Sequence, residues 1–284
     1  MKVEIALVQM DCVLGNVDAN LAHIEKKISD VGLRLGDRAA GTERVIVLPE
    51  CATTGYFVGE RAAELAEPSD GPTNARLAAM AASADAHLAV GVIESDGGHV
   101  YDALALFSPT DGLLASYRKV HLFASEKAVF SAGHTPCLVD TPFGRVGLTI
   151  CYDLMFPEYV RGLVLSGAQL IINGTDWITD PWQTGQGWTG DSVRALCRVR
   201  GLENGVHVVM ADRTGQESGF TSLGYSTISG PTGAVLAGID DGEGIAHALV
   251  EDPTADLDRW RSYATYLRDR QPTLYQQMGV ATQD

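Results

Sequence analysis

Residues 145–158 read Arg145-Val-Gly-Leu-Thr-Ile-Cys151-Tyr-Asp-Leu-Met-Phe-Pro-Glu158, an apolar strand pattern that ends at a cysteine and is followed by a helical pattern. A thiol at such a strand-to-helix turn is expected to be exposed at the edge of a sheet. The N-terminus of the following helix favours the thiolate, which is the nucleophilic form of cysteine. We therefore predict that Cys151 is a nucleophile.

Strands and helices alternate on both sides of this turn. Strand-like runs lie near residues 3–9, 44–49, 87–94, 100–107, 113–117, 144–150, 169–173 and 206–211, and amphipathic helical stretches lie near 18–31, 73–84, 156–166 and 191–204. This mixed order indicates a layered α/β domain. Pro and Gly in Ser108-Pro-Thr-Asp-Gly112 and Ser229-Gly-Pro-Thr-Gly233 predict two hairpin turns, which add antiparallel pairing.

No linker-like change of composition divides the 284 residues, so we predict a single domain over residues 1–284. The segment from Asp256 to Tyr275 mixes aromatic and charged residues, which is more typical of an arm or a partner-facing segment than of a core strand. Residues 251–284 are therefore predicted to form a C-terminal arm.

Composition and charge exclude several classes of protein. The net charge of −15 and the pI near 4.8 repel phosphate backbones and anionic membrane surfaces, so we expect no nucleic acid and no membrane as a partner. The apolar runs are strand-sized, far below the roughly 20 residues that span a bilayer. The first residues lack a signal-peptide pattern. Five scattered cysteines without a CxxC pair and seven histidines without ligand spacing argue against disulfides and metal sites. We expect a cytoplasmic protein without a cofactor or metal.

Charged residues lie at or beyond the ends of other predicted strands. Glu50 stands just past the buried run Val45-Ile-Val-Leu48, where burial would raise its pKa toward neutrality and suit it to general-base work. Lys119 follows another strand, and Glu126 lies seven residues further on. Taken singly, each is readily explained as a helix cap or a solvated charge. Together with Cys151, they lie at strand ends, where α/β sheets build their sites.

This ordered set of residues resembles the nitrilase, or carbon–nitrogen hydrolase, superfamily. The motifs that carry the resemblance are Leu48-Pro-Glu50, Tyr117-Arg-Lys119-Val-His-Leu, Glu126, Ile150-Cys151-Tyr-Asp153, Asn173-Gly-Thr-Asp-Trp177, Arg200-Gly-Leu-Glu-Asn204-Gly and Arg268-Asp-Arg-Gln-Pro-Thr-Leu-Tyr275. They cover nearly the whole chain, and the ordered set is highly specific.

The resemblance implies a four-layer α-β-β-α sandwich that hydrolyses an amide through a covalent acyl-enzyme. Glu50 would take the thiol proton of Cys151, and the thiolate would attack the carbonyl carbon. Lys119 and the backbone N–H of Tyr152 would hold the developing oxyanion, an interaction worth about 10²–10³ in rate per donor. Glu50 would then protonate the departing ammonia and activate water. Glu126 would position the substrate amide and stabilise Lys119.

Residues next to the nucleophile indicate the substrate. Tyr152-Asp153 is similar to the amidase branches, whereas nitrile-hydrolysing members tend to carry Trp-Glu there. Relatives that cleave N-carbamoyl amino acids place arginines where this chain has Leu154 and Met155, so a small neutral aliphatic amide is expected. Arg161 remains a candidate for a positive contact. The alternatives are an N-carbamoyl amino acid amidohydrolase, an omega-amidase, a nitrilase and an acyl transferase.

Several further patterns leave alternatives open. The aromatic residues near strand ends either line the acyl pocket or serve as packing: Tyr56, Phe123 and Trp177. The pattern Gly185-Gln-Gly187-Trp-Thr-Gly190 has the outline of a dinucleotide-binding loop, but roughly ten residues separate it from the preceding strand, so we interpret it as a pocket-side loop. A nucleotide-binding protein and a catalytically silent binding member are the competing classes. The resemblance also implies homodimers or larger assemblies, which stack helical faces and exchange C-terminal arms.

Overall fold

Alternation along the first strand, β1 (Lys2–Gln9), explains the layering of the molecule. Its side chains point in turn to opposite faces of a sheet. Ile5 and Leu7 belong to a core between two sheets, and Ala6 and Val8 belong to a second core beneath helices. A strand buried on both faces needs a layer on either side.

The computed structural model describes residues 2–251 and 253–278.

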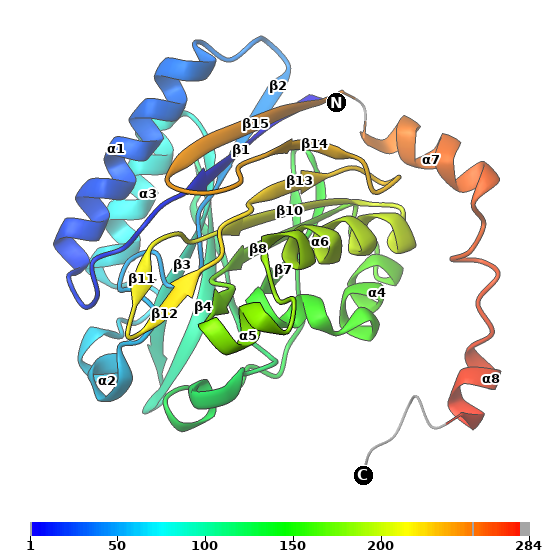
Figure 1. Ribbon diagram of the computed structural model, residues 1–284. Coiled ribbons are helices and arrows are strands. Elements are labelled where there is room, and N and C mark those ends of the chain that lie inside the picture. The colour runs from blue at the N-terminus through cyan, green and yellow to red at the C-terminus, as the bar shows by residue number, and fades with distance from the viewer. Residues whose placement is uncertain (1, 252, 279–284) are drawn as a thin grey trace.

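Two six-stranded sheets pack face to face (Figure 1). The first contains, in spatial order, β15 (Gly244–Glu251), β1, β2 (Thr42–Val47), β3 (His87–Asp96), β4 (His99–Ser108) and β5 (Gly112–Arg118). The second contains β14 (Val235–Gly238), β13 (Thr227–Ser229), β10 (His207–Asp212), β8 (Leu170–Thr175), β7 (Gly144–Ile150) and β6 (Cys137–Thr141). A small third sheet joins β11 (Gln216–Glu217), β12 (Phe220–Ser222) and β9 (Ile178–Thr179).

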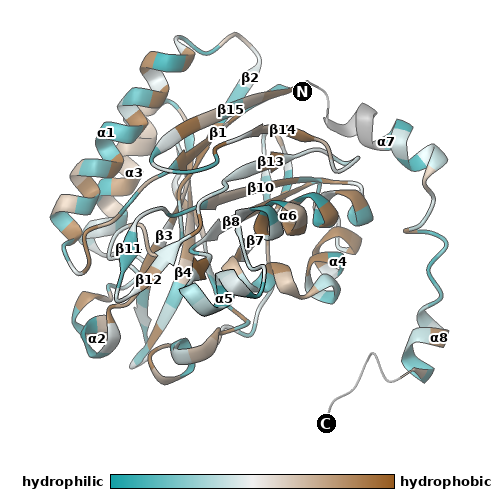
Figure 2. Cartoon of the chain, viewed as in Figure 1, coloured by the Kyte–Doolittle hydropathy of each residue, from teal (hydrophilic) through white to brown (hydrophobic). Residues whose placement is uncertain are grey.

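Helices cover the two outer faces. The first sheet is covered by α1 (Val17–Leu35) and α3 (Pro72–Ala84), and the second by α4 (Pro157–Leu165) and α6 (Gly190–Asn204). Figure 2 shows hydrophilic and hydrophobic residues alternating along α1, as expected for a helix with one buried stripe. These layers confirm the predicted α-β-β-α sandwich. Among the described helices, none is long and apolar enough to span a membrane.

Parallel strands in the middle of each sheet bring the candidate residues to one edge. β1, β2 and β3 run parallel, as do β7, β8 and β10, so their carboxyl ends lie together. Gly91 in β3 permits a close approach of the segment after β2, because a Cβ there would lie 2.4 Å from the carbonyl oxygen of Pro49 and from the backbone nitrogen of Cys51. The sheet edge and this glycine place Glu50 toward the second sheet.

The predicted strands and helices all occur, with small shifts at their ends. The two predicted turns join β4 to β5 and β13 to β14, and both pairs are antiparallel. The eight-residue strand β15 was not predicted, nor were these shorter elements: β6, β9, β11, β12, β13, β14, α2 (Ala62–Leu65), α5 (Pro181–Gly185), and the 3₁₀ helices η1 (Gly59–Arg61), η2 (Ala124–Ala128) and η3 (Cys151–Met155). In the predicted arm, α7 (Pro253–Tyr263) and α8 (Pro272–Gln277) lie outside the two-sheet body (Figure 1).

Candidate active site

Cys151 lies at the sharp turn between β7 and η3, and its backbone has a φ of 41°. A non-glycine residue rarely adopts this left-handed conformation, and such strain concentrates at functional sites. Its sulfur lies 3.8 Å from the carbonyl oxygen of Asp176. The prediction that the thiol is exposed is wrong, because Cys151 is only 4% exposed.

The expectation that a helix N-terminus favours the thiolate is also wrong for Cys151. Cys151 begins the short η3 itself, and α4 begins only at Pro157. Burial raises the pKa of the Cys151 thiol well above its usual value, and the charge of Glu50 raises it further, against the opposing effect of Lys119. Cys151 is therefore a neutral thiol that would need a base in order to act as a nucleophile.

Glu50 reaches both sheets with its two carboxylate oxygens. Oε1 accepts a hydrogen bond from Nζ of Lys119 at 2.5 Å, and Oε2 accepts one from the backbone N–H of Asp176 at 2.8 Å. Asp176 is also the residue whose carbonyl oxygen contacts Cys151. Burial raises the pKa of Glu50 well above its usual value, although Lys119 opposes this. The direction agrees with the prediction and gives Glu50 the proton affinity of a general base.

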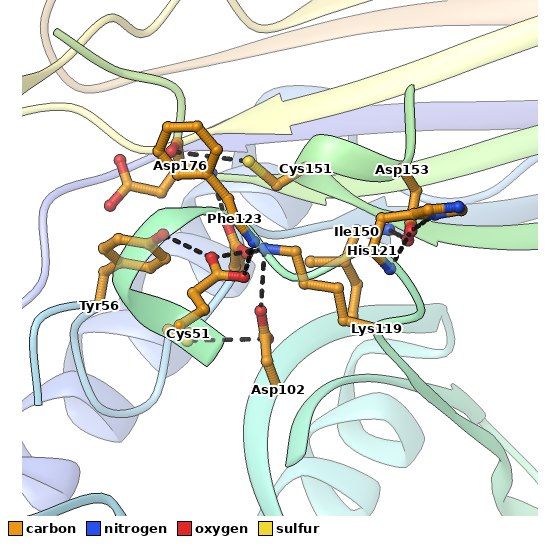
Figure 3. Close-up of polar contacts among 12 residues, drawn as sticks. Cys51, Tyr56, Asp102, Lys119, His121, Phe123, Ile150, Cys151, Asp153 and Asp176 are labelled. Atoms are coloured by element: carbon orange, nitrogen blue, oxygen red, sulfur yellow. Dashed lines mark hydrogen bonds and ion pairs between the residues drawn. The ribbon is translucent and has the colours of Figure 1, made fainter. Parts of the chain in front are cut away.

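Lys119 is the centre of the charged cluster. Its ammonium group contacts Glu50, Oε1 of Glu126 at 2.7 Å and Oδ2 of Asp102 at 3.4 Å, and all four side chains are buried. Figure 3 shows the ammonium end of Lys119 pointing into this group, with Asp102 on one side and Cys151 beyond the other. Burial alone would lower the pKa of Lys119, but the carboxylates of Glu50 and Glu126 raise it well above its usual value. Lys119 is therefore a fixed cation.

Glu126 is held by three donors. Its Oε1 accepts hydrogen bonds from Lys119 and from the hydroxyl of Tyr56 at 2.5 Å, and its Oε2 accepts one from the backbone N–H of Phe123 at 2.8 Å. The last bond closes the first turn of η2. Glu126 thus joins Lys119 to two segments that contain predicted pocket aromatics.

The carboxylate oxygens of Glu50, Asp102 and Glu126 lie within 4.8 Å of one another, a spacing that could hold a metal ion. The ammonium group of Lys119 already lies within reach of all three. A cation supplied by the chain itself occupies the position that a metal would take. The donor set therefore fits a buried lysine rather than a metal centre.

Asp153 connects the nucleophile turn to the strand before Lys119. Its Oδ2 accepts hydrogen bonds from the backbone N–H of Ile150 at 2.8 Å and from the hydroxyl of Tyr117 at 2.7 Å. Its Oδ1 lies 2.7 Å from Nδ1 of His121. The sequence indicated Asp153 only as a marker of the amidase branches. In the structure it aligns the Cys151 turn with the end of β5.

A second buried cluster surrounds Arg213, which follows β10 and is 0% exposed. Its guanidinium contacts Asp176 at 3.1 Å, Glu217 at 3.0 Å and Asp11 at 3.3 Å. Glu217 in turn accepts a hydrogen bond from the backbone N–H of Tyr56 at 2.9 Å. We did not predict this cluster, although Asp212-Arg213 after a buried strand gives the same kind of signal as Glu50. It fixes two segments that contact Glu50, Cys151 and Glu126.

The pocket aromatics differ in their surroundings. Tyr152 is half-buried, and its ring packs edge-on against Phe123, with ring centroids 5.2 Å apart. Tyr56 is buried and reaches Glu126. Trp177 is buried in the core between the sheets and packs against Trp188, which supports its interpretation as packing.

Residues considered for a positive substrate contact lie elsewhere. Leu154 is buried in the core, and Met155 is 42% exposed on the surface. Arg161 lies on α4 beside Arg270 and Tyr275 of the C-terminal segment, so the suggestion that it supplies the contact is not supported.

The glycine pattern of residues 185–190, which resembles a dinucleotide-binding loop, has another explanation. α5 separates it from β9, and a Cβ at position 190 would lie 1.9 Å from the ring of Tyr225.

Comparisons with known proteins agree with this geometry. A family model described as carbon-nitrogen hydrolase matches residues 4–264. A probable nitrilase from Schizosaccharomyces pombe is 30% identical, over 98% of this chain and 99% of its own. An (R)-stereoselective amidase from Pseudomonas is 34% identical over 81% of both chains. The amidase from Nesterenkonia sp. AN1, solved as a double mutant in complex with acrylamide, superimposes with a TM-score of 0.80 at 25% identity, over 97% of both chains.

Proposed function

The chain belongs to the carbon–nitrogen hydrolase family, and we propose that this enzyme is a thiol amidohydrolase that converts small neutral aliphatic amides to carboxylic acids and ammonia. The observation that carries the proposal is the arrangement around Asp176. Its backbone N–H binds Glu50, and its carbonyl oxygen contacts the sulfur of Cys151. Base and nucleophile are thus fixed against the same residue, with Lys119 bound to the base.

Acylation begins with the transfer of the thiol proton of Cys151 to Glu50. The thiolate then attacks the carbonyl carbon of the amide, and Lys119 and the backbone N–H of Tyr152 stabilise the oxyanion. Collapse of the tetrahedral intermediate breaks the C–N bond, and Glu50 returns the proton to the departing ammonia. Because the pKa of Glu50 is raised by burial, it serves as base and acid in turn.

Deacylation reuses the same groups. Glu50 takes a proton from water, which attacks the acyl carbon bound to Cys151. The thioester bond breaks, the carboxylic acid forms, and the proton returns to the sulfur. Glu126 keeps Lys119 in place through both steps, because its carboxylate binds the ammonium group.

A neutral substrate is favoured by the charges near the site. Lys119 is bound by three carboxylates, and Arg213 is bound by Asp176, Glu217 and Asp11. The charge of each cation is already compensated by carboxylates, so neither favours a substrate that carries a carboxylate of its own, as N-carbamoyl amino acids and omega-amides do. The solved Nesterenkonia amidase binds acrylamide, a small neutral amide. Omega-amidase, carbamoylase and nitrilase activities are the alternatives.

The test is ammonia release from small amides, an omega-amide, an N-carbamoyl amino acid and a nitrile. Cys151→Ala and Glu50→Gln are expected to abolish turnover of the preferred substrate, whereas Cys51→Ala, which removes a neighbouring buried thiol, serves as the matched control. Mass spectrometry should detect an acyl adduct on Cys151. Full turnover by Cys151→Ala, or an adduct on Cys51 instead, would contradict the mechanism.

We also propose a homo-oligomer. Apolar side chains are exposed on the outer faces of α4 and α6, and the C-terminal segment adds others: Leu165, Val199, Leu202, Leu274 and Met278. Such patches mark interaction surfaces. Light scattering coupled to gel filtration gives the subunit number, and removal of residues 251–284 should lower it.

The five cysteines are unpaired, which supports residence in the cytoplasm.

A further inference from the structure

We propose that Thr175 is a further catalytic residue, whose hydroxyl donates a hydrogen bond to the thiolate of Cys151 during the reaction. The inference rests on the proposed role of Cys151 as the nucleophile. The pairing of β7 with β8 brings the two residues to the same place. Ile150 pairs with Gly174 in this parallel ladder, and one residue further along each segment come Cys151 and Thr175.

The backbone of Thr175 is held by its neighbours. Thr175 pairs with Asp212 of β10, and its carbonyl oxygen accepts a hydrogen bond from the backbone N–H of Arg213 at 3.2 Å. Gly174 lets β8 approach the segment that carries the base, because a Cβ there would lie 3.3 Å from the backbone nitrogen of Glu50. The end of β8 is thus packed against the segment of the base as well as the turn of the nucleophile.

The hydroxyl of Thr175 lacks a good partner while Cys151 is neutral. Thr175 is 0% exposed, and among the described residues its Oγ1 has no hydrogen-bond partner other than the sulfur of Cys151. A thiol sulfur is a weak acceptor, so the hydroxyl is poorly satisfied in the resting enzyme. A buried hydroxyl without a good partner costs free energy, and that cost is recovered once the sulfur becomes a strong acceptor.

The other groups around the sulfur explain why a donor is needed there. The thiol donates to the carbonyl oxygen of Asp176 at 3.8 Å, so that oxygen would face an anion after deprotonation (Figure 3). The titratable side chains that interact with the thiol are Glu50, Lys119, Glu126 and Tyr56. Burial is the largest cause of the raised pKa of Cys151, and Lys119 and the hydroxyl of Thr175 act against it. Since Lys119 is bound by three carboxylates, Thr175 is a donor placed to stabilise the new charge.

The step that uses this donor is the proton transfer that begins acylation. The S–H bond of Cys151 breaks, the proton goes to the carboxylate of Glu50, and the bonding electron pair stays on the sulfur. The O–H of Thr175 keeps its own proton and donates to the sulfur, in a charge-assisted bond roughly twice as strong as a neutral one. Because the bond strengthens as the thiolate forms, it lowers the barrier to acylation. The same bond stabilises the sulfur when it leaves the acyl group in deacylation.

Thr175→Val tests the inference, because valine has nearly the shape of threonine and lacks the hydroxyl. Alkylation of Cys151 by iodoacetamide, followed by mass spectrometry of the modified peptide, reports the thiolate without a substrate. Loss of a bond to the charged form raises the pKa of the thiol. The curve of alkylation rate against pH should therefore move up by about one pH unit, which makes alkylation about 10-fold slower at neutral pH. Thr175→Ser keeps the hydroxyl and should leave the curve close to that of the wild type.

Turnover of the preferred amide gives a second readout. In Thr175→Val, kcat/KM should fall about 10-fold through kcat rather than KM, because the hydroxyl binds the nucleophile and not the substrate. Thr53→Val is the matched control. Thr53 is also buried, but its hydroxyl donates to the carbonyl oxygen of Gly91 at 3.4 Å, so its removal should leave both readouts unchanged.

The possible results separate the inference from the proposed function. An unmoved alkylation curve in Thr175→Val, or a curve for Thr175→Ser that moves equally far, would overturn the inference. If Thr175→Val does not fold, Thr175→Ala, which also lacks the hydroxyl, gives the same comparison, and an unmoved curve there likewise overturns it. A wild-type enzyme that releases no ammonia from any amide would refute the proposed function and leave the alkylation result standing. Amide hydrolysis by the wild type, with an unmoved curve in Thr175→Val, would refute only the role of Thr175.

Discussion

Replacing Arg213 with methionine is expected to destabilise the fold by about 3–5 kcal/mol. The guanidinium is 0% exposed and lies 3.1 Å from Asp176 and 3.0 Å from Glu217. Methionine fills much of the volume but leaves these two buried carboxylates without their cation. For a chain of this size, each kcal/mol lowers Tm by roughly 2–4 °C, so we expect a fall of roughly 10 °C.

The loss should depend on pH, with a sign that follows from Asp176. Burial raises the pKa of Asp176, and Arg213 opposes that effect, so the pKa rises further in Arg213→Met. A carboxyl whose pKa is raised by folding costs stability above its unfolded pKa, and the cost grows until the pH reaches the folded pKa. Relative to the wild type, the destabilisation is therefore largest above the raised folded pKa of Asp176 in the variant, and it decreases as the pH falls toward the lower folded pKa of Asp176 in the wild type.

Urea unfolding followed by circular dichroism, at one fixed protein concentration, measures this free energy. The matched control is the triple variant Arg213→Met, Asp176→Asn, Glu217→Gln, which removes the carboxylates together with the cation and should recover at least half of the loss. Two results would refute the reasoning. Arg213→Met could unfold within about 1 kcal/mol of the wild type at neutral pH, or the triple variant could be no more stable than the single one.

Three further changes probe how the site is held. Asp153→Asn removes an acceptor from the nucleophile turn, and kcat should fall about 10-fold to 100-fold while far-ultraviolet circular dichroism stays unchanged; a normal kcat would show that the turn holds without it. Gly91→Ala forces Pro49 and its neighbours away from β3, so kcat/KM should drop by about 100-fold. The control is Gly162→Ala, at a helical position with open space around it, which should leave kcat/KM unchanged. Tyr56→Phe removes a hydrogen bond to Glu126 that is worth about 1–2 kcal/mol, and a stopped assay should detect a roughly 10-fold loss of kcat; equal rates would place Tyr56 outside the mechanism.

Local sequence patterns were sufficient for most elements, and they indicated the candidate reactive residues. The period of hydrophobic residues predicted the strands at the centre of both sheets, because these strands are long and buried. Glu50 and Cys151 follow buried strands inside the two sheets, whereas Lys119 follows the edge strand β5, and the structure brings the three residues together where these strands end. Strands of two to four residues, such as β9 and β14, were not predicted. Such short segments are too short to show the alternation of apolar and polar residues that marks a strand.

The protonation state of Cys151 was decided only by the tertiary structure. The strand-to-helix pattern indicated an exposed thiolate at Cys151, yet the segment around Asp176, after a neighbouring strand, contacts the thiol and helps to bury it. Desolvation depends on which distant segments pack over a group, and no local pattern records that.

The order of residues along the chain indicated the candidate reactive groups: a cysteine, two glutamates and a lysine at or beyond strand ends. The charge balance that tunes them came from contacts across the fold. Arg213 meets Asp176 and Asp11, which lie 37 and 202 residues away in the sequence, and Asp102 meets Glu50 only around Lys119. A side chain's reactive group is a local property, whereas its pKa and orientation are set by neighbours that only folding supplies.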